Sequence, residues 1–218
     1  MTMQDLLLSA IDARILGVLM EKQLTTPDQY PLTLNSLVTA CNQKTSREPV
    51  SSYSSGEVGS SLNELRNNKL VEVEYGSRAE RYDQKLSRVL GLDKRKQAIL
   101  TIMLLRGPQT AGDLLTRSQR MAEFDGIADM EELLETLCNK SQPMIMRIAK
   151  RAGQRDDRYM HLLCGEIDLS SLPEPSASAA GSATASNAEL VKRVEVLERK
   201  LALVMAQLDL QEDSSEEE

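Results

Sequence analysis

The sequence predicts a mainly helical α+β fold in which three helices and a β-hairpin occur twice, followed by a tail of different composition. Two observations carry this prediction. The chain of 218 residues is 41% hydrophobic but only 3% aromatic, so its core is expected to be aliphatic, which favours helices over a sheet sandwich. The order of apolar periodicities, caps and turns along residues 9–84 also recurs along residues 93–164.

The first unit opens with three expected helices. Ser9 stands at a capping-box-like start, and apolar residues recur at helical spacing from there to about Leu24. Thr33 is the expected N-cap of a second helix that ends near Cys41. A capping box that begins at Ser54 predicts the start of a third helix.

A β-hairpin is expected directly after these helices. Residues 70–75 alternate between apolar and polar side chains as a strand does, residues 76–80 are turn formers, and Arg81 begins the return strand. Three helices followed by a hairpin is the order of the winged helix, an elaborated helix-turn-helix. We therefore expect a winged-helix unit over residues 9–84.

The same order is expected a second time over residues 93–164. Helical periodicity covers residues 95–105, a short helix is expected from Thr110 to Arg117, and a third from Met130 to Cys138. Residues 144–148 and 158–162 bracket Gly153 as a longer hairpin. The sequence therefore predicts two tandem winged-helix units.

The remaining residues differ in composition. Residues 165–187 are rich in Ser, Ala, Gly and Pro and are expected to form a flexible linker. Residues 188–210 carry a heptad seam that predicts a coiled coil and a homodimer, formed by Leu190, Val194, Leu197, Leu201, Val204 and Leu208. Residues 211–218 are expected to be a disordered acidic tail.

The net charge of −7 is unevenly distributed. Residues 1–164 hold 22 basic and 21 acidic residues, whereas residues 165–218 hold 4 basic and 12 acidic residues. A neutral body does not exclude nucleic acid as a partner. The first residues lack the features of an export signal, no apolar run is long enough for a membrane helix, and the three cysteines are isolated. We therefore expect a cytoplasmic protein that does not contact a membrane.

Four segments resemble motifs of a known bacterial family, the YceH-like proteins. The longest are Thr26-Pro-Asp-Gln-Tyr-Pro-Leu-Thr-Leu-Asn35 and Cys41-Asn-Gln-Lys-Thr-Ser-Arg-Glu-Pro-Val50, and residues 105–110 and 153–162 are similar to later motifs. The resemblance covers about residues 9–163 and implies a tandem winged-helix fold in a bacterial cytoplasm. It implies no particular activity, substrate or catalytic residue. Residues 111–113 depart from the family pattern, which affects a helix start.

No arrangement of side chains predicts catalysis, and we expect neither a metal nor an organic cofactor. His161 is the single histidine, and no Cys/His cluster has the spacing of a metal site. Gly56 and Gly59 form a GxxG sequence that also occurs in RNA-binding KH domains, but the flanking elements follow the winged-helix order. The prediction is a binding protein rather than an enzyme.

The first unit offers one candidate nucleic-acid surface. Amide and basic side chains, which pair with base edges and phosphates, gather on the loop before the third helix and on the exposed side of that helix. These residues are Asn42, Gln43, Lys44, Arg47, Ser60, Asn63, Arg66 and Asn67. The alternative is an ordinary polar helix face.

The second unit offers a different surface. Its third helix is acidic and is a poor candidate for entering a groove of DNA, but its hairpin is basic and suited to phosphates, through Arg147, Lys150, Arg151, Arg155 and Arg158. A charged edge strand would look the same. We expect a protein that binds double-stranded DNA in a regulatory or nucleoid-associated role. The alternative is a scaffold whose winged-helix surfaces bind another protein.

Overall fold

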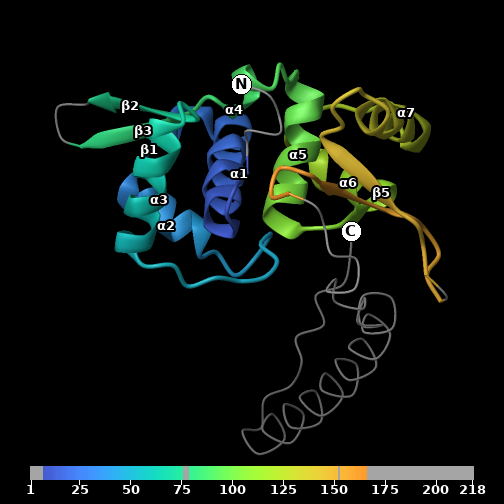
Figure 1. Cartoon of the computed structure of the whole chain (residues 1–218), viewed down its shortest axis with the longest axis horizontal. Helices are drawn as coiled ribbons and strands as arrows, with labels where there is room; N and C mark the ends of the chain where they lie inside the picture. Colours follow the sequence, from blue (N-terminus) through green and yellow to red (C-terminus); the bar gives the residue numbers. More distant parts are fainter. Residues whose placement is uncertain (1–6, 76–78, 152, 166–218) are drawn as a thin grey trace, which may run out of the picture. The chain divides into compact units, whose positions relative to one another are not determined.

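The computed structural model describes residues 7–75, 79–151 and 153–165, all of which belong to one compact unit. Helices and small antiparallel sheets make up this unit, which confirms the predicted α+β class (Figure 1). The predicted coiled coil, the acidic tail and all but the first residue of the predicted linker lie outside the described residues.

The first half of the unit comprises the elements from residue 10 to residue 89. Three longer helices precede a β-hairpin, and short elements lie between them. In chain order these are α1 (Ala10–Thr25), the 3-10 turn η2 (Pro27–Gln29), β1 (Leu32–Thr33), α2 (Leu34–Cys41), α3 (Ser55–Asn67), β2 (Val71–Tyr75), β3 (Glu80–Gln84) and α4 (Leu86–Val89).

The second half, residues 94–161, repeats the sequence of a helix, a short strand, two helices and a hairpin. Its elements are α5 (Lys94–Arg106), β4 (Gln109–Thr110), α6 (Ala111–Ser118), α7 (Ile127–Cys138), β5 (Ile145–Ile148) and β6 (Arg158–His161). Three helices and a hairpin thus occur in both halves, as the sequence patterns predicted, and a short strand after the first helix of each half adds to that order.

Polar caps start the helices where the sequence predicted them. Ser9 caps α1 and Ser54 caps α3, each within a complete capping box. Thr33 caps α2 by accepting a hydrogen bond from the backbone N–H of Ser36. Such caps satisfy backbone donors that have no partner inside the helix, so they fix where each helix begins.

Each half contains a three-stranded antiparallel sheet with the same strand order, β1-β3-β2 and β4-β6-β5. In both sheets the first short strand pairs with the return strand of the hairpin, so that Leu32 lies opposite Tyr82 and Gln109 opposite Tyr159. The short strands were not predicted, because two residues show no periodicity and their strand geometry depends on a distant partner.

Two further elements differ from the sequence prediction. Helix α7 begins at Ile127, three residues before the predicted start, because Gly126 adopts a φ of 142° and supplies the turn into the helix without a polar cap. The short helix α4 after the first hairpin was not predicted either.

Helices α1 and α5 form the centre of the unit (Figure 1). They run antiparallel, since Gln23 near the end of α1 contacts Gln97 near the start of α5, whereas Gly17 faces Leu104 and Leu105 further along α5. A Cβ atom at Gly17 would lie 3.0 Å from side-chain atoms of both leucines. The missing side chain therefore lets the two helices approach closely.

Polar contacts join the two halves beside this helix pair. The side-chain oxygen of Gln23 accepts hydrogen bonds from the amides of both Gln84 and Gln97, which are buried. The backbone N–H of Glu48 donates to the carbonyl of Leu105 at 2.8 Å, close to the end of α5. These contacts hold the halves as one body and fix their candidate surfaces relative to each other.

Candidate nucleic-acid interface

The predicted face of α3 is exposed. Val58, Leu62 and Leu65 turn inward and are buried, so the opposite side of the helix faces solvent. The predicted residues Ser60, Asn63, Arg66 and Asn67 are all exposed on α3. Arg66 donates a long hydrogen bond of 3.5 Å to the side-chain oxygen of Asn63, one turn earlier, which places an amide and a guanidinium side by side.

The prediction that Arg47 is available for nucleic acid is wrong. Its side chain is buried and pairs with the carboxylate of Glu21 at 2.6 Å. Its Nε also donates to the carbonyl of Ala40 at 3.0 Å, at the end of α2. Sequence reasoning treated this arginine as a solvent-facing loop cation, whereas it forms an internal ion pair.

The other predicted loop residues divide by role. The side chain of Asn42 makes two hydrogen bonds of 2.8 Å to the backbone of Tyr53, and Gln43 accepts a hydrogen bond from Arg47. Both amides therefore shape the loop between α2 and α3. Lys44 is exposed and makes no ion pair with any residue whose position the structure gives, so among these loop residues it alone is accessible for the predicted contact.

A second buried arginine, Arg14 on α1, was missed. It donates to the carbonyl of Cys41 at 3.2 Å and to the carbonyl of Pro49 at 2.7 Å, which ties the loop to α1. Burial raises the pKa of the Cys41 thiol to about 12, so this thiol stays protonated. No pattern in α1 identifies an inward-facing arginine, because its partners are backbone carbonyls far along the chain.

The basic side chains of the β5–β6 hairpin differ in whether they form an ion pair. Arg147 pairs with Asp157, which also accepts a hydrogen bond of 2.9 Å from the backbone of Lys150. The side chains of Lys150, Arg155 and Arg158 make no ion pair within the described ranges, although Lys150 donates a long hydrogen bond to the carbonyl of Arg155. Arg151 is exposed at the same hairpin. The hairpin thus keeps uncompensated positive charge.

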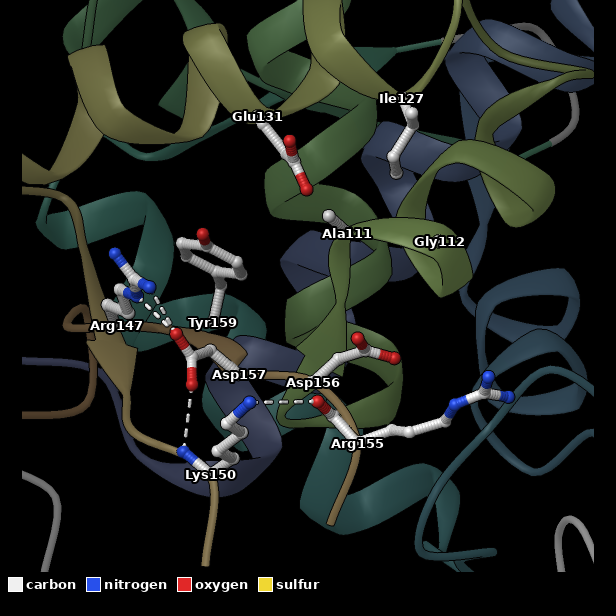
Figure 2. A pocket seen from close by; sticks show the side chains of 10 residues that line it. All are labelled: Ala111, Gly112, Ile127, Glu131, Arg147, Lys150, Arg155, Asp156, Asp157 and Tyr159. Carbon is white, nitrogen blue, oxygen red and sulfur yellow. Dashed lines mark hydrogen bonds and ion pairs between the residues drawn. The ribbon is translucent and has the colours of Figure 1, made fainter.

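A groove of about 410 Å³ lies between this hairpin and the helices α6 and α7. Figure 2 shows Glu131 of α7 and Asp156 of the hairpin on opposite sides of Ala111, while the Arg155 side chain extends away from the other lining residues. The hairpin supplies the basic residues and Tyr159, and α7 supplies Ile127 and Glu131. The hairpin also supplies Asp156 and Asp157, so its wall is mixed in charge, whereas the α7 wall is acidic.

The surface of α7 next to the groove is acidic, as predicted. Glu131, Glu132 and Glu135 are exposed, and none forms an ion pair with another residue of known position in the structure. Asp129, by contrast, pairs with Arg95 of α5. Phosphates would be repelled by this row of carboxylates, so α7 is a poor candidate for contact with nucleic acid.

The hairpin of the first half carries carboxylates beside Arg81 at its exposed edge. Glu74 and Glu80 are exposed there, and Tyr75 beside them is 74% exposed. Lys85 is engaged by both Glu72 and Asp83. These carboxylates make the described edge of this hairpin less suited to phosphates than the β5–β6 hairpin.

His161 lies inside the second half. It is 4% exposed, its Nδ1 has no hydrogen-bond partner among the described residues, and burial lowers its pKa to about 4. The imidazole is neutral at physiological pH. Within the described ranges, no group of three or more His, Cys, Asp or Glu side chains is placed to hold a metal ion. No helix there is both long and apolar enough to cross a membrane.

Comparison with known proteins gives a family but no activity. A UPF0502 protein of Cellvibrio japonicus is 56% identical over 94% of each chain. UPF0502 proteins of Pseudomonas paraeruginosa and Stenotrophomonas maltophilia are 50% and 43% identical, over 82% and 93% of this chain and 83% and 93% of theirs. Residues 8–154 match the family described as "Protein of unknown function, DUF480". The bacterial family that the sequence motifs predicted is thereby confirmed, and the chain belongs to the DUF480 family.

Proposed function

We propose that the protein binds double-stranded DNA without catalysing a reaction, and that each half acts as a winged helix. The order of helix, short strand, two helices and hairpin in both halves supports the winged-helix interpretation. The observation that carries the DNA proposal is the exposed row of Asn63, Arg66 and Asn67 on α3. Amides and arginine are the side chains that make paired hydrogen bonds to base edges in the major groove.

Phosphate contacts in this proposal come from the second half. Lys150, Arg155 and Arg158 have no carboxylate partner within the described ranges, so a phosphate would not have to displace one. Arg147 contributes less, because Asp157 already neutralises it. Contacts of this kind position a protein on DNA without reading the sequence.

A second function, binding of another protein, is favoured by a different observation. The acidic face of α7 and the mixed-charge groove beside it are unsuited to nucleic acid. Ile127 is 45% exposed at this groove, which gives a protein partner an apolar contact. This alternative predicts partner binding that does not depend on nucleic acid.

Fluorescence anisotropy on a selected duplex and on a scrambled duplex, at several salt concentrations, tests the DNA proposal. Replacing Lys150, Arg151 and Arg155 by Ala should weaken binding to both duplexes and flatten the salt dependence by roughly one unit of slope per lost contact. Arg66→Ala should cost about 1–3 kcal/mol on the selected duplex and much less on the scrambled one.

Arg88→Ala is the matched control, because Arg88 is exposed on α4, outside both candidate surfaces. It should leave the affinity unchanged. Absence of binding by the unaltered protein at low salt would overturn the DNA proposal and leave protein binding as the remaining candidate. Loss of affinity in the hairpin variants alone would mean that the protein grips the backbone without choosing a sequence.

A further inference from the structure

The acidic side chains of α7 are unbalanced within their own helix. Glu131 and Glu135 are one turn apart, and the last turn of α7 contains no basic residue. Like charges four residues apart and a carboxylate near the C-terminal end both destabilise a helix. With Glu132 beside them, these carboxylates lack any ion-pair partner in the described part of the chain.

Unpaired positive charge lies across the groove from α7, on the β5–β6 hairpin. Lys150 and Arg155 on the hairpin line the same groove as Glu131, but neither pairs with a carboxylate of any described residue. Asp156 belongs to the same lining, so the hairpin side keeps a smaller excess of positive charge than its cations alone suggest. One half of the molecule therefore presents uncompensated positive and negative charge side by side. Figure 2 shows that the Arg155 side chain does not extend toward Glu131.

The floor of the groove leaves room for a contact. Ala111 and Gly112, at the start of α6, line it together with Ile127 and Tyr159. A Cβ atom at Gly112 would meet nothing closer than the Thr110 hydroxyl, at 3.9 Å. The fold itself does not require a glycine here, yet the glycine keeps this part of the groove open.

We propose that this surface is a contact between two copies of the chain, in which the hairpin of each copy lies against the acidic face of α7 in the other. A twofold axis brings each element of one copy onto its complement in the other, so a surface with adjacent positive and negative elements is self-complementary. Both sets of unpaired charge are then compensated at once, and the exposed Ile127 of α7 adds an apolar contact. This inference goes beyond DNA binding and does not depend on it; because both use Lys150 and Arg155, a second copy and DNA would compete for the hairpin.

A charge-swap experiment tests the proposal on the full chain without nucleic acid. One variant combines Glu131→Lys with Glu135→Lys, and the other combines Lys150→Glu with Arg155→Glu. Each variant alone should associate at least tenfold more weakly than the unaltered protein in sedimentation velocity, because hairpin and helix then carry the same sign. An equimolar mixture should regain the association, since each altered element meets its complement on the other variant.

Filling the groove provides a second test with a matched control. Gly112→Gln should reduce self-association at least tenfold, because the new side chain occupies the groove floor. Gly56→Gln is the control: Gly56 holds the equivalent second position of α3, and its Cβ would also lie 3.9 Å from the capping hydroxyl. It should leave self-association unchanged.

The outcomes decide the proposal in both directions. Weak association of each charge variant, recovery in the mixture and loss in Gly112→Gln would support it. Equal mass for all variants and the mixture would overturn it, whether the chain is a monomer or associates through another segment. If Gly112→Gln loses self-association but retains its affinity for DNA, the contact between copies is distinct from the proposed phosphate contacts at the hairpin.

Discussion

Arg47 is a charged residue whose environment is entirely internal. Its guanidinium pairs with Glu21 and bonds to backbone carbonyls at the end of α2 and in the following loop. A buried ion pair adds little stability compared with an apolar pair, but removing one partner leaves an uncompensated buried charge. Arg47 therefore matters for the fold rather than for contact with a ligand.

We expect Arg47→Ala to lower the free energy of unfolding by about 3 kcal/mol, because Glu21 would keep only its longer ion pair of 3.5 Å with Lys22, and three hydrogen-bonded carbonyl and amide groups would lose a donor. Urea denaturation followed by circular dichroism measures this change. Arg66→Ala removes an exposed arginine and should change stability by no more than about 0.5 kcal/mol. Equal effects of the two substitutions would contradict the buried role of Arg47.

The burial of His161 should make the folded protein less stable as the pH falls below 6.5. Its pKa is about 4 in the folded protein and ordinarily 6.5, because burial disfavours the charged imidazole. As pH falls from 6.5 to 4, the unfolded chain takes up a proton that the folded protein does not. The free energy of unfolding should therefore fall by about 3 kcal/mol over this interval through this one group.

The comparison of the unaltered protein with His161→Leu isolates this contribution, since His161 is the single histidine of the chain. Urea titrations at a series of pH values should show the variant gaining stability relative to the unaltered protein as pH falls from 6.5 to 4. Parallel curves would mean that the imidazole is solvated in the folded protein.

At the scale of elements, the close packing of α1 on α5 depends on a glycine. Gly17→Ala places a methyl group 3.0 Å from Leu104 and Leu105, and such overpacking outweighs the gain in helix propensity. We expect a net destabilisation of about 1–2 kcal/mol in thermal or urea unfolding. Gly59→Ala on α3 is the matched control: its Cβ would meet nothing within 4 Å, so it should stabilise by about 0.5–1 kcal/mol.

Some of these elements could be predicted from the sequence and others could not. The helix starts at Ser9, Thr33 and Ser54 were predictable because a cap acts on backbone groups within three residues of it. The strands β1 and β4 were not, because each consists of two residues whose conformation is set by pairing with a strand about fifty residues away.

The candidate site follows the same division. The exposed face of α3 was predictable, because Val58, Leu62 and Leu65 define the buried side of a regular helix. The burial of Arg47 was not, because its partner Glu21 lies on another helix and is recognised only when both are placed. The groove beside α7 likewise joins elements that are distant in sequence.

At the scale of the whole molecule, the two halves share one core and one central helix pair. We expect them to unfold in a single cooperative transition. Native-state hydrogen exchange should give the slowest amides of α1 and α5 the same free energy of opening and the same dependence on denaturant, because neither helix can be exposed without the other. Gly17→Ala should lower both values equally. Clearly different values for the two helices would mean that each half is stable on its own.

The antiparallel pairing of α1 with α5 also has a consequence for the nascent chain. A ribosome releases α1 first, but the helix that covers its Gly17 side ends only at Arg106. At about 5–20 residues per second, this wait lasts on the order of ten seconds. During that time the apolar surface of α1 that faces α5 has no partner within its own chain. The nascent chain should therefore be most prone to aggregation, and most dependent on chaperones, before its second half has emerged.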